Sequence, residues 1–274
     1  MRRSVTKCAA WLLGLVLAAC GEGAPSPAAQ AEARALFEQG REAIRRDDYK
    51  AAEDLLARAA ELHPTSAEFQ YALGIARYQR SVVMLGLRSV EGERLRAAQE
   101  NFDRAIELDP AGPSAYAYHL YGGLARERAH QPEAAIPFFL EALRLNPDNI
   151  QARLRLGISY QVTQRADEAR AELEQVLARE PGNGRAWHHL GLACQELEQW
   201  DRSLLALDRA VALAPTDPAP HFDRVESLRR LGRQDEADAA MEHFRELHDA
   251  SQAQDLESIR QSMEAELESG GGPR

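Results

Sequence analysis

The sequence predicts an all-α protein built as a solenoid of stacked helical hairpins, and three observations indicate this fold. Apolar residues make up 45% of the 274 residues and aromatic residues only 6%, which favours helices rich in Ala and Leu over a β-rich fold. Similar short segments that end in proline recur along the chain. Between these prolines, apolar residues form two stripes at helical spacing, separated by a short polar turn.

The recurring segments define a repeat of 34 residues. They read RAAELHP, RAIELDP, EALRLNP, QVLAREP and RAVALAP and end at Pro64, Pro110, Pro147, Pro181 and Pro215. The intervals are 46, 37, 34 and 34 residues, so one unit contains 12 additional residues and another contains 3. Each proline follows a second helix, where the chain has to stop and reverse. Because one hairpin cannot bury its apolar faces alone, we expect neighbouring hairpins to stack.

The repeat resembles the tetratricopeptide repeat, whose pattern is W-x₂-L-G-x₂-Y, then A-x₃-F, then P. Unit 184–217 matches it with Trp187, Leu190, Gly191, Leu207, Ala210 and Pro215, and has Cys194 where the family usually has Tyr. The resemblance covers six units, which are 33–66, 67–112, 116–149, 150–183, 184–217 and 218–251. It implies a right-handed α-solenoid of about six hairpins over residues 31–251.

Two segments depart from the simple repeat. Unit 67–112 contains most of its 12 additional residues near 81–95, where apolar residues favour extended, packed helices over a loop. Within 252–274, Leu256, Ile259, Met263 and Leu267 form one stripe, which predicts a capping helix on the last repeat followed by a flexible tail. The alternative for this stripe is a partner-binding helix.

The first residues have the features of an export signal. A basic segment precedes an apolar run from Ala9 to Ala19, and these 11 residues are too few to cross about 30 Å of hydrocarbon as a helix. The run ends in LAAC at residues 17–20, which resembles the lipobox of bacterial lipoproteins. The resemblance implies that residues 1–19 are removed as a lipoprotein signal peptide and that Cys20 is lipidated. Ordinary secretion is the alternative.

The lipoprotein resemblance also implies a location. Residues 20–30 would form the lipidated cysteine and a flexible tether, which holds the repeats near a bilayer. Gly21 stands where Asp would indicate retention in the inner membrane of a Gram-negative cell. The implied location is therefore the cell envelope, with the periplasmic side of the outer membrane favoured over the inner membrane.

No pattern in the chain indicates catalysis, a cofactor or a metal site. P-loop, GxSxG, HExxH, GxGxxG and CxxC motifs are absent from the sequence. His188 and His189 are adjacent, so on a helix they point about 100° apart and cannot chelate one metal. A net charge of −10 argues against nucleic acid as the main partner, because phosphate binding needs clustered Lys and Arg. We interpret the acidity as a solvated face, with a basic partner as the alternative, and Cys194 as a small buried core residue.

Function is therefore expected to come from the surface of the first helices, since repeats of this family usually turn positions 2, 5, 9 and 12 of each unit toward a concave groove. The candidate groove residues carried over from the family are Phe37, Tyr71, Ile75, Tyr78, Leu120, Leu124, Leu154, Ile158, His188, Leu192 and Phe222. This set offers few charges, which predicts an amphipathic helix or an apolar extended segment as the ligand. The alternative is that these residues pack between adjacent repeats.

Together these observations predict a non-enzymatic lipoprotein, anchored to the membrane through its lipid, that holds an unidentified protein partner at the bacterial cell envelope. A self-associating structural lipoprotein, whose groove and C-terminal helix bind another copy, is the alternative. No cofactor, no metal and no nucleic acid is expected in either case.

Overall fold

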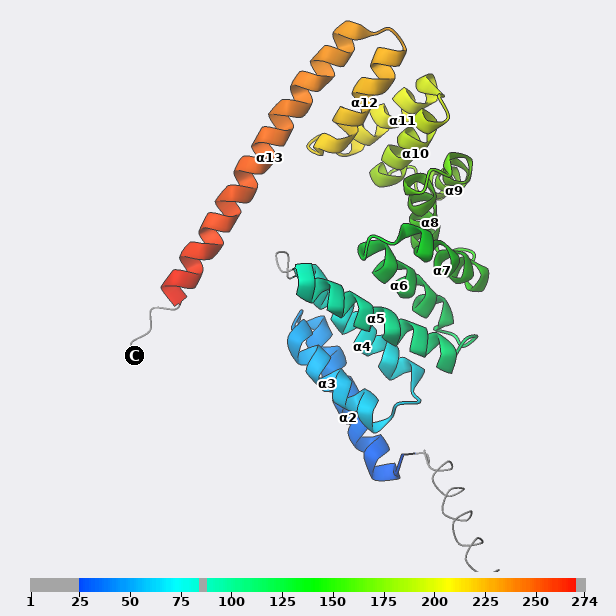
Figure 1. Ribbon diagram of the computed structural model, residues 1–274, viewed down its shortest axis with the longest axis vertical. Coiled ribbons are helices and arrows are strands. Elements are labelled where there is room, and N and C mark those ends of the chain that lie inside the picture. The colour runs from blue at the N-terminus through cyan, green and yellow to red at the C-terminus, as the bar shows by residue number, and fades with distance from the viewer. Residues whose placement is uncertain (1–24, 84–87, 270–274) are drawn as a thin grey trace, which may run out of the picture. The chain divides into compact units, whose positions relative to one another are not determined.

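The computed structural model describes residues 25–83 and 88–269, and every regular element in these ranges is an α-helix (Figure 1). The helices are α2 (Pro27–Arg45), α3 (Tyr49–Leu62), α4 (Ala67–Val83), α5 (Arg88–Leu108), α6 (Ala115–Arg128), α7 (Pro132–Leu145), α8 (Ile150–Val162), α9 (Ala166–Arg179), α10 (Gly184–Glu196), α11 (Trp200–Leu213), α12 (Pro218–Arg230) and α13 (Gln234–Ser269). Consecutive helices pair as packed hairpins, from α2/α3 to α12/α13. The all-α prediction of stacked hairpins is confirmed.

The chain divides after Pro110 into two compact units. The first unit contains the hairpins α2/α3 and α4/α5, and α3 packs against α4. The second unit contains α6/α7, α8/α9, α10/α11 and α12/α13, in which each second helix packs against the first helix of the next hairpin. Each unit therefore has its own repeat stacking.

Side chains next to the recurring prolines fix where the first helices begin. Asn149, Asn183 and Asp217 each follow a closing proline by two residues. Their side-chain oxygens accept hydrogen bonds from backbone N–H groups in the first turn, at 2.9, 3.0 and 3.0 Å. Such N-caps satisfy donors that the helix itself leaves free. The proline and its cap together stop one hairpin and start the next.

Among the hairpins whose turn the structure describes, each turn has one residue in the left-handed backbone region. In the last hairpin this residue is Gly232, with a φ of 73°. The other hairpins with a short turn use Asp47, His130, Gln164 and Glu198, with φ between 56° and 60°. From His130 to Gly232, successive positions are 34 residues apart, so the turn conformation repeats with the sequence.

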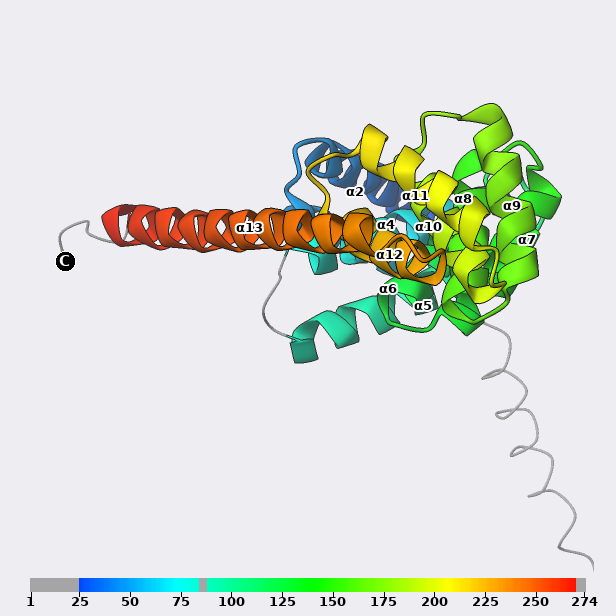
Figure 2. The same ribbon diagram turned by 90° about the horizontal axis from the view of Figure 1, so that it is seen from above.

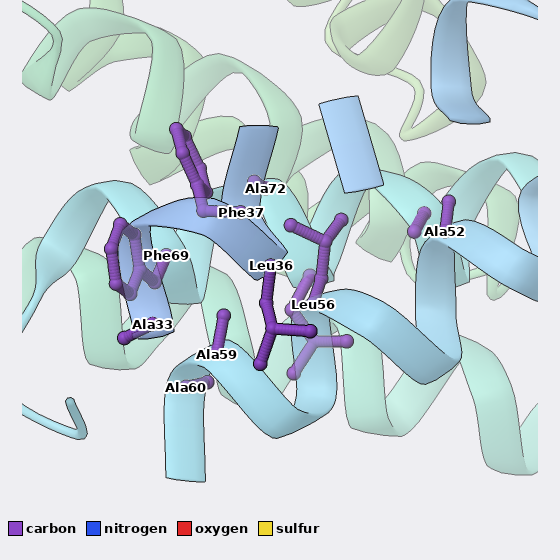
Figure 3. Close-up of a cluster of buried hydrophobic side chains, with 11 residues drawn as sticks. Ala33, Leu36, Phe37, Ala52, Leu56, Ala59, Ala60, Phe69 and Ala72 are labelled. Carbon is purple, nitrogen blue, oxygen red and sulfur yellow. The ribbon is translucent and has the colours of Figure 1, made fainter. Parts of the chain in front are cut away.

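In every hairpin but the last, a glycine in the first helix lets the second helix of the same hairpin approach closely. A Cβ added to Gly191 would lie 2.5 Å from Leu207 Cγ, and one added to Gly123 would lie 2.6 Å from Phe139 Cε1. Leu207 and Phe139 are both completely buried, so neither can move aside without repacking. Figure 3 shows the corresponding core of the first unit, where Leu56 lies among small alanines.

The additional residues of unit 67–112 lie mostly in helices. Helix α4 has 17 residues and α5 has 21, whereas the helices of the next three hairpins have 13 or 14. The prediction of an extended helical pair is therefore confirmed for 81–83 and 88–95. Residues 84–87 lie outside the described part of the chain.

The prediction of a separate capping helix after residue 251 is wrong. Helix α13 runs without a break from Gln234 to Ser269, so the second helix of the last hairpin and the C-terminal helix are one element of 36 residues (Figure 2). The reason is local, because no glycine or proline interrupts the sequence between Gly232 and Gly270. The described side chains beyond residue 250 are exposed, so they do not cover the last repeat.

Candidate protein-binding surface

In the second unit the first helices form one layer, which we call the first-helix face. Helix α8 contacts α6 and α10, and α10 contacts α12. Among the described residues, no such close backbone contact joins the second helices α7, α9 and α11, although the side chain of Arg202 on α11 reaches Glu174 on α9. Helices that touch on one side and separate on the other make an array that curves toward the touching side. The first-helix face is therefore the inner side of this unit.

Four of the predicted groove residues are buried between helices. Phe37 is 2% exposed, and Leu120, Leu124 and Ile158 are each 4% exposed. The ring of Phe37 stacks on Phe69 of the next hairpin, with 4.6 Å between ring centroids. These side chains pack between repeats, as the alternative interpretation predicts, and offer no surface to a partner.

The other predicted groove residues reach solvent to different degrees. In the first unit, Tyr71, Ile75 and Tyr78 are half-buried on α4. In the second unit, Leu154, His188 and Leu192 are half-buried, and Phe222 is 50% exposed. The apolar surface of the first-helix face is thus smaller than the sequence predicts.

The first-helix face also carries charged groups that the sequence analysis missed. Arg155 on α8 donates to Glu127 Oε1 on α6 at 2.9 Å, and Arg185 on α10 approaches the same oxygen at 4.0 Å. Within the described residues, Glu127 Oε2 and Arg155 Nε are buried without a hydrogen-bond partner. Burial and the nearby charge of Arg155 lower the pKa of Arg185. Two arginines therefore share one carboxylate, and the expectation of few charges on this face is wrong.

A second polar group joins α8 and α10. His189 Nδ1 lies 3.0 Å from Gln161 Oε1, and Gln161 Nε2 donates to Glu196 Oε1 at 2.9 Å. Burial, helped by the charges of His188 and Arg185, lowers the pKa of His189 to about 3. His189 is therefore neutral near pH 7, and its Nδ1–H donates to Gln161.

His188 connects α10 to α12 on the same face. Its Nε2 lies 2.5 Å from Asp223 Oδ2, and both side chains are largely buried, at 16% and 23% exposed. Gln195 on α10 donates to the backbone oxygen of Asp223 at 2.7 Å and to Ser227 Oγ at 2.9 Å. These hydrogen bonds hold neighbouring first helices in register, so the face is preorganised.

The low pKa of His189 predicts a pH-dependent stability. The unfolded chain takes up a proton on this side chain below its ordinary pKa of about 6.5, whereas the folded chain does not, so stability falls as pH drops from about 6.5 toward 3. We expect His189 to cost up to about 2 kcal/mol of unfolding free energy between about pH 7 and pH 5. Urea unfolding at the two pH values measures this loss.

His189→Gln is expected to make the loss smaller. It will not abolish the loss, because burial also lowers the pKa of His221. The exposed His248→Gln is the matched control. An equal pH dependence in wild type and His189→Gln would contradict the assignment of a neutral His189.

Side chains that could bind a metal do not cluster in the described part of the chain. Within the described residues no three His, Cys, Asp or Glu side chains gather as metal ligands. Cys194 is 1% exposed, and burial raises the pKa of its thiol, so it is the buried core residue that the sequence predicts. None of the described helices is long and apolar enough to span a membrane. Cys20 and the predicted signal peptide lie outside the described residues.

Models of the tetratricopeptide repeat match most of the chain. One matches residues 37–81 and 83–150, and another matches 128–194 and 163–221. Together these ranges cover well over half of the 274 residues. The chain is a tetratricopeptide-repeat protein.

Solved structures share the fold of this tetratricopeptide-repeat protein. YrrB, described as a TPR protein with an unusual peptide-binding site, is 21% identical with a TM-score of 0.56, covering 68% of this chain and 88% of its own. MamA 41-end from Desulfovibrio magneticus RS-1 is 24% identical with a TM-score of 0.53, covering 68% and 97%. At these identities the likeness shows the fold alone.

A similar protein in sequence is the antiviral innate immune response effector IFIT1 of Homo sapiens. It is 25% identical over 136 residues, which are 47% of this chain and 28% of the human protein. This tetratricopeptide-repeat protein thus spans less than a third of that relative.

Proposed function

We propose that this tetratricopeptide-repeat protein is a non-catalytic scaffold that binds a polypeptide segment of a partner protein on its first-helix face. The observation that carries the proposal is the composition of the face formed by α8, α10 and α12. Half-buried Leu154 and Leu192 and exposed Phe222 supply apolar contacts, and Arg185 supplies a charge that is only distantly paired. Tetratricopeptide-repeat proteins are generally interaction scaffolds, which agrees with this use.

The ligand that fits this face is an amphipathic segment with both an apolar and a polar side. Apolar side chains alone would leave Arg185 and its neighbours desolvated without partners, which is costly. The face is also tied together by the His188–Asp223 and Gln161–Glu196 contacts, so little ordering is needed on binding. Binding is then expected to weaken with added salt, because a charged group contributes.

A paired substitution tests this proposal. Leu192→Ser together with Phe222→Ser should abolish capture of the partner, because both side chains leave the face. The melting temperature should stay nearly unchanged, since Phe222 is 50% exposed and Leu192 is half-buried. Pull-down beside a circular-dichroism melt measures both effects.

Leu140→Ser together with Leu213→Ser is the matched control, since these leucines are each 46% exposed on the second helices α7 and α11. Equal capture by the two double variants would contradict the proposed face. An early melt of the first variant would mean that its side chains are part of the core.

We further propose that the protein is held at the cell envelope by lipid on Cys20. The LAAC sequence at 17–20 supports this proposal, and the export signal before it agrees with it. The predicted flexible tether of residues 20–30 is too long, because helix α2 already begins at Pro27. Residues 21–26 reach at most about 21 Å, at about 3.5 Å per residue, so the repeats would stay close to the bilayer. The outer membrane of a Gram-negative cell is the proposed location.

A further inference from the structure

A cleft of about 370 Å³ lies between the second helices α9 and α11, with α10 at its base. It belongs to the opposite layer from the first-helix face, because its walls come from second helices. Leu177 and Leu190 line it together with Cys194 and Ala206. Clefts of this size with apolar walls are typical of sites that bind an organic group.

The 34-residue repeat explains why the cleft exists. In the preceding repeat, Tyr160 stands at the position of Cys194, and Glu172 stands at the position of Ala206. Tyr160 is 6% exposed, and Glu172 pairs with Arg153 at 2.7 Å, so large side chains occupy that place. Two small residues replace a ring and a long side chain in the repeat α10/α11. Both small residues lie at the floor of the cleft, where each is 1% exposed.

The other hairpins of the second unit fill the equivalent place in different ways. In α6/α7 the guanidinium of Arg126 lies 3.8 Å from the ring centroid of Phe138. In α12/α13 Leu228 is completely buried beside Ala240. Within the described hairpins of this unit, α10/α11 alone has small residues at both positions.

The chemistry of the cleft favours an uncharged occupant. At its rim Arg202 donates to Glu174 Oε1 at 2.7 Å, so the two charges that line it satisfy each other. The buried Cys194 thiol stays neutral, because burial raises its pKa. A charged group entering the cleft would lose its hydration and find no free opposite charge.

We propose that this cleft binds an aromatic side chain of a partner polypeptide. The ring takes the place that Tyr160 occupies in the preceding repeat, which sets both its size and its apolar character. Leu205 at the rim is 60% exposed, and residues that flank the aromatic side chain would cover it. Anchors of this kind, an aromatic side chain in an apolar pocket, dominate many interfaces.

Fluorescence of Trp187, which lines the cleft, gives a direct test. In the full-length chain carrying Trp11→Phe and Trp200→Phe, Trp187 is the remaining tryptophan. N-acetyl-phenylalanine amide is expected to change its emission saturably, with a dissociation constant on the order of millimolar for so small a probe. N-acetyl-alanine amide should cause no saturable change. The tripeptide acetyl-Leu-Phe-Leu-amide should bind about tenfold more tightly, because its leucines can cover Leu205.

Two variants fill the cleft from different helices. Cys194→Tyr restores the side chain of the preceding repeat, and Ala206→Leu fills the cleft from α11. Each is expected to weaken binding of the tripeptide at least tenfold, and a raised melting temperature would confirm that the space was filled. The exposed Leu140→Ser is the control and should bind as the parent does.

Three results would overturn the proposed binding of an aromatic side chain in the cleft. If a filled variant that keeps its helicity binds the tripeptide as tightly as the parent, the cleft is not the site. If Cys194→Tyr does not fold, Ala206→Leu decides in the same way. The proposal is also overturned if the parent binds neither aromatic probe, or if it binds the alanine probe equally well. Loss of partner capture by Leu192→Ser with Phe222→Ser concerns the other layer and leaves this test unaffected.

Discussion

Replacing Ala169 by Glu is expected to unfold the hairpin α8/α9 and to lower stability by several kcal/mol. Ala169 is completely buried on α9, one turn before the completely buried Leu173. A carboxylate there would lose its hydration, and burying a charge in a packed core is costly. Stability in a repeat stack depends on neighbouring interfaces, so unfolding should begin in 150–183 and spread to adjacent repeats.

Ala171→Glu is the matched control, because Ala171 is exposed on the same helix. It introduces the same charge into the same helix and should change the unfolding free energy by no more than about 0.5 kcal/mol. Urea unfolding followed by circular dichroism measures both variants, and hydrogen exchange locates the first opening. Equal stability of the two variants would contradict the packing of α9 on α8.

Replacing Cys20 by Ala is expected to release the protein from the membrane fraction completely. The proposed lipid is the anchor, and acyl chains contribute about 0.8 kcal/mol per buried CH₂, so the loss of all chains leaves no comparable attachment. The variant should also keep its signal peptide, because processing follows lipidation in the lipoproteins that the LAAC sequence resembles. Detergent phase partitioning and the mobility of the protein on a denaturing gel measure the two effects.

Cys8→Ala is the matched control, since Cys8 precedes the apolar run and is not the lipobox cysteine. It should be lipidated and processed as the wild type is. A Cys20→Ala variant that still partitions into detergent and migrates like the wild type would overturn the proposed anchor.

The hairpins were predictable because the residues that define them act locally. Pro181 ends a second helix, Asn183 caps the next first helix, and Gly191 permits the close approach of Leu207. Each of these effects depends on one or two side chains and recurs with the repeat. The bounds of the helices and their pairing into hairpins can therefore be predicted from residues that are close together in the sequence.

The C-terminal end of the repeats was less predictable, because a new stripe of apolar residues does not by itself show that one helix ends and another begins. Leu256 lies on a stripe that suggested a new helix, yet helix formers fill the chain from Gln234 to Ser269. Leu256 itself is 68% exposed. A strong helical sequence continues past the last packing contact when no proline or glycine stops it.

The binding surfaces could be predicted only in part. Positions 5 and 9 of each unit named the apolar residues, but the charged Arg155 and Arg185 come from other positions of the first helices. Their pairing with Glu127 crosses three helices and depends on how tightly the repeats stack. The cleft beside Cys194 likewise depends on which residue of α11 lies next to Cys194. Alignment of the repeats shows that both Cys194 and Ala206 are small, but not that they lie together.

Site-specific photo-crosslinking tests the central claim, that the first-helix face binds a partner polypeptide. Benzoylphenylalanine is placed at Leu192 on α10 or, as the control, at Leu140 on α7, which is 46% exposed. Irradiated cells are then analysed for the mass and identity of each adduct. An adduct to a different polypeptide is expected from Leu192, and little or none from Leu140. An adduct from Leu192 that contains only another copy of this chain, or a different partner captured from Leu140 and not from Leu192, would contradict the central claim.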